Sequence, residues 1–250
     1  MPTPFPFSPA KTPFRGLHNS LHISEMALFF FRVFKFLFFC SIIVWMISEM
    51  GMRYFVFLTN WGFFTGWIYY TMILIDKLIL KEKQECFKQA TMIIFEIAIN
   101  AEFVIAIIYW LALFKMDYEH HENDLDFGAW LFNTIAIHLI GFILLWLDFT
   151  VNQLKFRKKN VLIVFIFLSI YGIFNLVYSL TYGSIYPIIT WRDFQSYLLI
   201  VIMFILTYVH HFLGMTFHSK IKKKYIKDKK KYHSYKDESK DGKQQGQIIN

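Results

Sequence analysis

A hydroxyl, a carboxamide and an imidazole occur inside long apolar stretches of this chain. Thr59 and Asn60 lie in the run from Arg53 to Asp76, and His138 lies in a run that begins near Gly128. Polar side chains within membrane-length apolar segments are candidates for function, because the bilayer does not solvate them. A threonine hydroxyl becomes nucleophilic when a neighbouring base takes its proton, and a neutral histidine can act as that base. The sequence therefore permits a catalytic pair of Thr59 and His138.

Three further polar residues are candidates to support this pair. Asn60 is placed to orient it or to donate to an oxyanion. At ~1.5 Å per helical residue, Thr59 lies roughly 8 Å from the outer membrane face and His138 roughly 15 Å from it. The same count puts Glu102 roughly 16 Å from that face, where it would hold His138. Asp148 follows on the segment of His138 and lies deeper, toward the cytosolic end.

A structural role for the same side chains stays open. A membrane threonine commonly bonds the carbonyl four residues earlier, and an interior histidine commonly bonds a neighbouring helix. His138 with His210 or His211 would ligate a haem only at matched depth, and the depths differ by ~6 Å. Adjacent histidines point about 100° apart on a helix, so at most one would face a given site. Glu96 and Asn100 share part of a face and either line a cavity or join helices.

Composition indicates a membrane protein. Hydrophobic residues make up 56% of the 250 residues and charged residues only 18%, with the charges gathered in loops and tails. A soluble domain does not segregate charge in this way. Six apolar segments each have nearly the ~20 residues that a spanning helix needs. They run from 27 to 47, 54 to 75, 91 to 113, 128 to 147, 161 to 182 and 197 to 216. The expected fold class is all-α, a polytopic membrane protein with a six-transmembrane-helix bundle.

Lysine and arginine set the expected orientation. Basic residues crowd the loops between segments two and three, between four and five, and after six, whereas the loop between three and four is acidic. The positive-inside rule then places both termini in the cytosol. Arg32 and Lys35, near the cytosolic end of the first segment, are expected to snorkel toward the interface.

Three regions follow from this pattern. Residues 1–26 form a Pro-rich cytosolic arm, residues 27–217 the transmembrane domain, and residues 218–250 a Lys-rich cytosolic tail that is expected to be disordered. The net charge of +8 comes mostly from the tail, which suits binding to anionic cytosolic lipid rather than nucleic acid. Cys40 and Cys86 have no metal-binding spacing and predict no disulfide framework. Neither a cofactor nor a metal is expected.

Three patches give a resemblance to a known family. They are FLTNWGFF from Phe57 to Phe64, HLIGFILLWLD from His138 to Asp148, and YGSIYP from Tyr182 to Pro187. Together with the basic run KFRKKN, they make residues 27 to 217 resemble the androgen-induced-gene family of membrane hydrolases and the related rolling stone family. The LTNWG form is closer to rolling stone. The residues after His138 depart from the hydrolase pattern, which has a Thr and a Pro there.

The resemblance implies a six-span hydrolase that cleaves fatty acid esters of hydroxy fatty acids. The intramembrane Thr nucleophile and His partner of that family match Thr59 and His138. The expected function is therefore intramembrane hydrolysis of lipid esters in the endoplasmic reticulum or plasma membrane, with a membrane lipid or acyl ester as partner. The alternative is a non-catalytic multi-pass membrane protein with the same fold, an adhesion, fusion or structural subunit. The sequence leaves the oligomeric state open.

Overall fold

The computed structural model describes residues 17–18, 20, 23–81, 83–222 and 224, and in this part of the chain every regular element is a helix. The first half comprises α1 (Glu25–Met50), η1 (Gly51–Val56), α2 (Leu58–Leu78), α3 (Glu85–Ile108), η2 (Tyr109–Leu113) and α4 (Phe114–His121). The second half comprises α5 (Phe127–Ile135), η3 (Ala136–Ile140), α6 (Gly141–Val151), η4 (Lys158–Asn160), α7 (Val161–Tyr182), α8 (Phe194–Phe217) and η5 (His218–Lys222).

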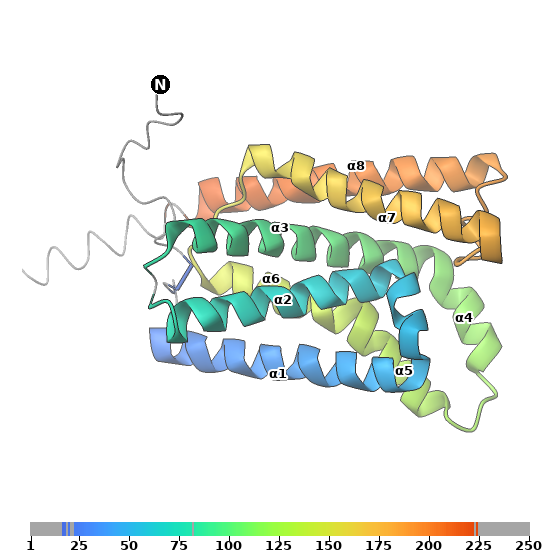
Figure 1. Ribbon diagram of the computed structural model, residues 1–250, viewed down its shortest axis with the longest axis horizontal. Helices are drawn as coiled ribbons and strands as arrows, with labels where there is room; N and C mark the ends of the chain where they lie inside the picture. Colours follow the sequence, from blue (N-terminus) through green and yellow to red (C-terminus); the bar gives the residue numbers. More distant parts are fainter. Residues whose placement is uncertain (1–16, 19, 21–22, 82, 223, 225–250) are drawn as a thin grey trace, which may run out of the picture.

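The long helices form a bundle in which α3 is central. It contacts α2, α6, α7 and α8, and α1 packs on the far side of α2. Figure 1 shows α1, α2 and α3 side by side, with α7 and α8 along the opposite side of α3. More than half of the α3 side chains are buried, as expected for a helix surrounded by others. The end where α1 begins also holds the ends of α2, α6 and α8, and is called the first end below.

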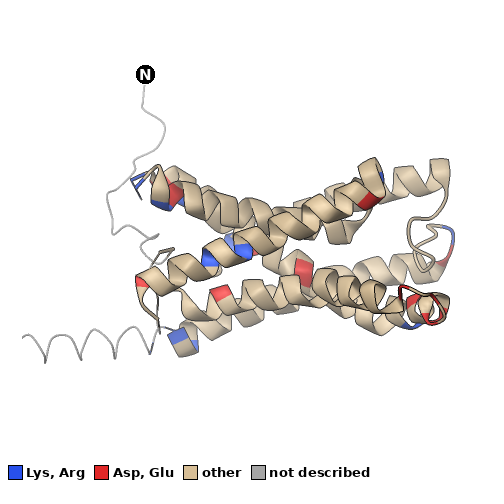
Figure 2. Ribbon diagram, turned by 90° about the horizontal axis from the view of Figure 1, so that it is seen from below, with Lys and Arg blue, Asp and Glu red and all other residues tan. Residues whose placement is uncertain are grey.

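Five helical segments are long and apolar enough to cross a membrane. They run from 25 to 56, 85 to 121, 127 to 151, 158 to 182 and 194 to 222 among the described residues. Figure 2 shows charged residues near both ends of the bundle and a few along the middle of the helices. The prediction of a multi-pass, all-α membrane protein is confirmed to this extent.

Six spans were predicted, and the predicted span that is not among these five segments is 54–75, which corresponds to α2. Its buried side carries Thr59, Asn60, Thr65, Tyr69 and Asp76, and these polar and aromatic residues dilute the apolar character of the helix. With 21 residues it is nevertheless about 30 Å long, comparable to the bilayer core. The polar face of α2 is directed inward because α1 and α3 cover it on two sides.

Among the described residues, η5 after α8 is a π-helical turn, and two further π-helical turns lie inside helical segments. One covers Tyr109–Leu113, where α3 passes into α4, and the other covers Ala136–Ile140, where α5 passes into α6. Such turns insert a residue into the helical ladder and are frequent at functional sites. Both turns lie away from the first end, and they carry Tyr109 and His138.

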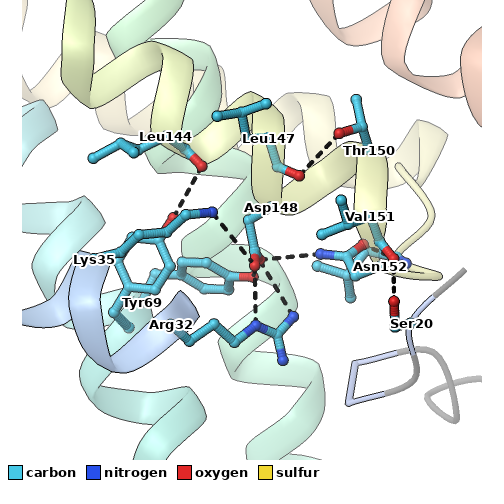
Figure 3. A network of polar contacts seen from close by, with 12 residues as sticks. Ser20, Arg32, Lys35, Tyr69, Leu144, Leu147, Asp148, Thr150, Val151 and Asn152 are labelled. Atoms are coloured by element: carbon cyan, nitrogen blue, oxygen red, sulfur yellow. Dashed lines mark hydrogen bonds and ion pairs between the residues drawn. The ribbon is translucent and has the colours of Figure 1, made fainter. Parts of the chain in front are cut away.

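A buried ionic cluster at the first end corrects the prediction that Arg32 and Lys35 snorkel. Both side chains turn inward, with 2% and 0% exposure. Arg32 donates to Asp148 from Nε at 3.0 Å and from Nη2 at 3.3 Å, and Lys35 Nζ lies 3.7 Å from the same carboxylate (Figure 3). Tyr69 and Asn152 also donate to Asp148. The two side chains turn inward because Asp148 offers them a buried counter-ion.

Parts of the predicted arm and tail also pack on this end. In the arm, Leu17 is fully buried and His18 Nε2 lies 2.7 Å from Asp76 Oδ2. In the tail, the Lys222 ammonium donates to the Leu154 carbonyl at 3.2 Å and lies 3.4 Å above the Phe149 ring. Residues 1–16 and 225–250, on which most of the arm and tail predictions fall, lie outside the described residues.

Candidate active site

An apolar cavity of about 780 Å³ opens in the half of the bundle away from the first end. Its volume is in the range of ~300–1,000 Å³ that is common for small-molecule sites. Its walls come from α1, α2, α3, η2, α4, η3, α7 and α8 and from the loop between α7 and α8. The few polar groups on this lining include Thr59, Asn60, His138 and Tyr186. A cavity of this kind suits a molecule that is mostly hydrocarbon with one polar group.

Thr59 lies in the first turn of α2 and is 8% exposed. On the same helix, Thr65 and Thr71 donate to the carbonyl four residues earlier. No such bond is found for Thr59 in the described part of the chain; its side chain instead lies near the Tyr186 hydroxyl, whose pKa it lowers. The Thr59 hydroxyl therefore lies beside Tyr186 at the cavity wall.

Asn60 lines the cavity but has a clear structural contact. Its Nδ2 donates to the Tyr54 carbonyl at 2.6 Å, and the Tyr54 hydroxyl lies 3.4 Å from the Asn60 carbonyl. These two contacts close the turn between α1 and α2 and set the position where α2 begins. Asn60 thus fixes the place of its neighbour Thr59, while a role toward an oxyanion stays a prediction.

His138 lies in the π-helical turn of Ala136–Ile140 and faces the same cavity. Its ring stacks on the Tyr109 ring with centroids 3.5 Å apart and planes 2° apart. The Tyr109 hydroxyl donates to Asp117 at 2.6 Å, which fixes the tyrosine under the imidazole. His138 Nδ1 has no hydrogen-bond partner among the described residues. The imidazole is therefore held by stacking and retains an unengaged nitrogen.

The structure brings Thr59 and His138 to one cavity without a hydrogen bond between them in the described part of the chain. Catalytic hydrogen bonds are often long before substrate binds and shorten in the complex. Both side chains line the same cavity, and their catalytic pairing stays a prediction.

Glu102 is fully buried between α2 and α6. A Cβ on Gly62 would lie 2.8 Å from its Oε1, and a Cβ on Gly141 would lie 3.0 Å from its Oε2. Gly62 and Gly141 follow Thr59 and His138 by three residues each, so the carboxyl lies about one turn beyond the pair. Neither oxygen has a hydrogen-bond partner in the described chain, so the expected bond that would hold His138 is not made.

Asp148 lies in the ionic cluster at the first end and contacts Arg32, Lys35, Tyr69 and Asn152. It is not part of the cavity lining. The structure thus places this predicted supporting residue in a different cluster, because its carboxylate is the counter-ion of the two buried cations of α1.

The two histidines of α8 correct the expectation that at most one faces a given site. His210 Nδ1 donates to Asn100 Oδ1 at 2.8 Å, and its Nε2 accepts from Trp146 Nε1 at 3.0 Å. His211 Nε2 donates to the Arg157 carbonyl at 3.0 Å, and its Nδ1 accepts from Asn100 Nδ2 at 3.4 Å. Asn100 can bond both rings, although they point in different directions, because its amide has an acceptor oxygen and a nitrogen with two donors.

These contacts show structural roles for Glu96, Asn100, His210 and His211, which the sequence left open. Glu96 accepts from the Arg157 amide at 3.2 Å and from Asn160 at 3.0 Å, so it fastens the loop between α6 and α7. Asn100 joins α3 to α8 through both histidines. Since both ring nitrogens of His210 are engaged within the protein, the ring is not set up as a haem ligand.

Sequence reasoning gave no site role to Tyr109 or Tyr186. Tyr186 belongs to the YGSIYP patch, so the motif was visible although its role was not. For Tyr109 the sequence offers no signal, because the stacking on His138 depends on where two helices meet.

Comparisons with family models, curated proteins and solved structures give no match to this chain.

Proposed function

We propose that the protein is an intramembrane hydrolase of lipid esters, fatty acid esters of hydroxy fatty acids or similar molecules. The observation that carries the proposal is that Thr59 and His138 line one apolar cavity of about 780 Å³. A hydrocarbon-lined cavity accepts an acyl chain at little cost, since the chain leaves lipid for an equally apolar wall. The resemblance of residues 57–64 and 138–148 to a family of membrane hydrolases supports the same assignment.

The reaction proceeds through an acyl-enzyme. His138 takes the proton of the Thr59 hydroxyl as its oxygen attacks the ester carbonyl, and then gives that proton to the departing alcohol. Water, deprotonated by His138, attacks the acyl-threonine, the fatty acid leaves, and the proton returns to Thr59. The stacked Tyr109 ring keeps the imidazole plane fixed during both proton transfers. The steps use no cofactor or metal.

The proposal includes a topology. Helix α2 makes the sixth span, since it is as long as the bilayer core and lies between two spanning helices. Both termini face the cytosol, because the basic loops and the Lys-rich tail belong on that side. The first end is then cytosolic, the tail binds anionic lipid, and the cavity lies in the outer half of an endoplasmic reticulum or plasma membrane protein.

A second candidate function is a non-catalytic membrane protein that holds a lipid in the same cavity. It is favoured by the observed partners of Asn60 and Thr59, which are Tyr54 and Tyr186 rather than His138. In that case the polar residues hold helices together, and the lipid is bound but not cleaved.

Covalent labelling separates these two functions. A fluorophosphonate probe that carries an alkyl chain is added to membranes with the native chain, Thr59→Ala or His138→Ala. The expected result is labelling of the native chain and none of either variant, because both the nucleophile and its base are needed. Thr65→Ala is the matched control, since Thr65 lies on the same helix and its hydroxyl is bound to the Trp61 carbonyl.

Thr65→Ala is expected to label as the native chain does. Labelling that persists in Thr59→Ala would overturn the assignment of the nucleophile. A native chain that stays unlabelled, beside an active membrane hydrolase that labels under the same conditions, would favour the non-catalytic function.

A further inference from the structure

The loop between α7 and α8 reaches across the cavity to the start of α2. It leaves α7 at Gly183, whose φ of 103° is a conformation that L side chains rarely adopt. The Ile189 amide donates to the Tyr186 carbonyl at 3.0 Å, which closes a turn. Trp191 Nε1 donates to Asn175 on α7 at 2.6 Å and fastens the other end. The loop is thus held at both ends, with the Tyr186 hydroxyl directed at α2.

The Tyr186 hydroxyl has three polar neighbours. The backbone amide of Leu58, the first residue of α2, donates to it at 2.8 Å. The Thr59 side chain lies near enough to lower the pKa of this phenol, and the Tyr171 hydroxyl lies 3.4 Å away. The proposed nucleophile and this phenol are therefore neighbours at the cavity wall.

Counting protons shows that the Tyr186 hydroxyl is available as a donor. A phenol carries one proton, and that of Tyr171 goes to the Val56 carbonyl at 3.0 Å. The amide of Leu58 fills one acceptor position of the Tyr186 hydroxyl. Among the described residues, no carbonyl or carboxylate is recorded as an acceptor for its proton; the Tyr171 hydroxyl lies at 3.4 Å, which is longer than the ~2.7–2.8 Å of a good O–H···O bond.

The surroundings keep this phenol in its neutral form. Burial of the hydroxyl raises the pKa of Tyr186 well above its usual range, and the Leu58 amide and the Thr59 side chain lower it by less. A phenol with a raised pKa retains its proton at neutral pH and donates a hydrogen bond. The hydrogen bond that its oxygen accepts from the Leu58 amide polarises the O–H group and strengthens that donation.

We propose that Tyr186 is a catalytic residue that donates its phenolic hydrogen bond to the ester carbonyl oxygen as Thr59 attacks. The inference rests on the proposed hydrolase function. No proton is transferred from Tyr186: the carbon–oxygen π bond opens, the oxygen becomes negative, and the O–H group turns from Tyr171 toward it. When the carbonyl re-forms and the alcohol leaves, the phenol returns to its earlier contact.

Such a donor acts on the transition state more than on the bound ester. A developing oxyanion is a stronger acceptor than a carbonyl, so loss of the hydrogen bond lowers kcat and leaves KM nearly unchanged. Removal of one oxyanion donor costs about 10²–10³-fold in kcat in other hydrolases. A tyrosine that served only to fix the loop would instead change the fraction of folded protein.

The test is steady-state hydrolysis of p-nitrophenyl palmitate in mixed micelles by the full chain, Tyr186→Phe and Tyr182→Phe. Tyr182 is the matched control, because it lies four residues earlier and is 77% exposed. Thermal unfolding of each purified variant reports the folded fraction, by which kcat is corrected. Tyr186→Phe is expected to lose about 10²–10³-fold in kcat with KM within a few-fold, and Tyr182→Phe to match the native chain.

Two outcomes are separable in this experiment. If the native chain turns over the ester, Thr59→Ala does not, and Tyr186→Phe keeps the native kcat, the role of Tyr186 is wrong while the hydrolase function stands. If the native chain is no faster than Thr59→Ala, the hydrolase function is wrong and the role of Tyr186 falls with it. A rise in KM alone in Tyr186→Phe would make it a residue for binding and contradict the inference.

Discussion

Replacement of Asp148 by asparagine is expected to destabilise the bundle more than any other single loss of a charge. The carboxylate is fully buried and accepts hydrogen bonds from Arg32, Tyr69 and Asn152. Asparagine retains the shape but removes the charge, so Arg32 and Lys35 are left buried without a counter-ion. Because both cations are buried, water cannot replace the lost carboxylate, and the unfolding free energy falls.

The magnitude follows from these distances. Charges about 4 Å apart attract by roughly 4 kcal/mol at an effective dielectric constant of ~20. Lys35 lies 3.7 Å and Arg32 3.0 Å from the carboxylate. Part of this attraction only offsets the cost of burying the charges. Removal of one charge of a buried pair therefore lowers the unfolding free energy by about 3–5 kcal/mol. We expect Asp148→Asn to lose this amount of unfolding free energy.

The assay is reversible unfolding in mixed detergent micelles, followed by near-ultraviolet circular dichroism. Glu49→Gln is the control, because Glu49 is an exposed carboxylate at the other end of α1 and should change stability by less than about 0.5 kcal/mol. A double variant with Arg32→Met is expected to recover part of the loss. Equal stability of Asp148→Asn and Glu49→Gln would refute the electrostatic account of this cluster.

Two further predictions concern packing and topology. Gly66→Ala should cost about 1–3 kcal/mol of unfolding free energy, because a Cβ there would lie 2.5 Å from the ring of the fully buried Phe39. Gly172→Ala, where a Cβ would have nothing within 4 Å, should be neutral or mildly stabilising. Unfolding of both variants in micelles checks this, and equal losses would contradict it. Cys86 is exposed at the start of α3 and should react with a membrane-impermeant maleimide only when the cytosolic face is open. In a Cys86→Ser background, Leu125→Cys should react from the opposite face, since Leu125 is fully exposed between α4 and α5; labelling of both from one face would overturn the topology.

The helices were largely predictable from the sequence, since their lengths follow from uninterrupted apolar runs. The predicted segment 161–182 coincides with α7, and the segment 197–216 lies within α8. The third segment was predicted to end at 113, yet the helix continues through α4 to His121, because the mixed polar and aromatic residues of α4 contain no Pro or Gly that would end a helix.

The partners of polar side chains were much less predictable. Depth along a helix follows from rise per residue, and Thr59 and His138 do line one cavity, while their pairing stays a prediction. Which way a side chain points depends on helix rotation, which α2 and α6 acquire from their neighbours. Glu102 and Asp148 therefore came to lie against two glycines and two cations, rather than beside His138.

The π-helical turns show a second limit of sequence reasoning. One extra residue in a turn rotates everything after it by about 100°, so faces assigned by regular periodicity drift across such a turn. Tyr109 and His138 each lie in one of these turns, and their rings stack because both helices are rotated there. No residue type marks the turns in the sequence.

The three intramembrane histidines form a comparison within one protein. His210 and His211 each have both ring nitrogens bonded, to Asn100 and to Trp146 or the Arg157 carbonyl. His138 is held by stacking, and its Nδ1 has no partner among the described residues. An unpaired buried polar atom costs about 1–3 kcal/mol, a cost that the other two histidines avoid. His138 alone of the three lines the cavity, so its ring is the one that a bound molecule can approach, although the unpaired Nδ1 itself is buried.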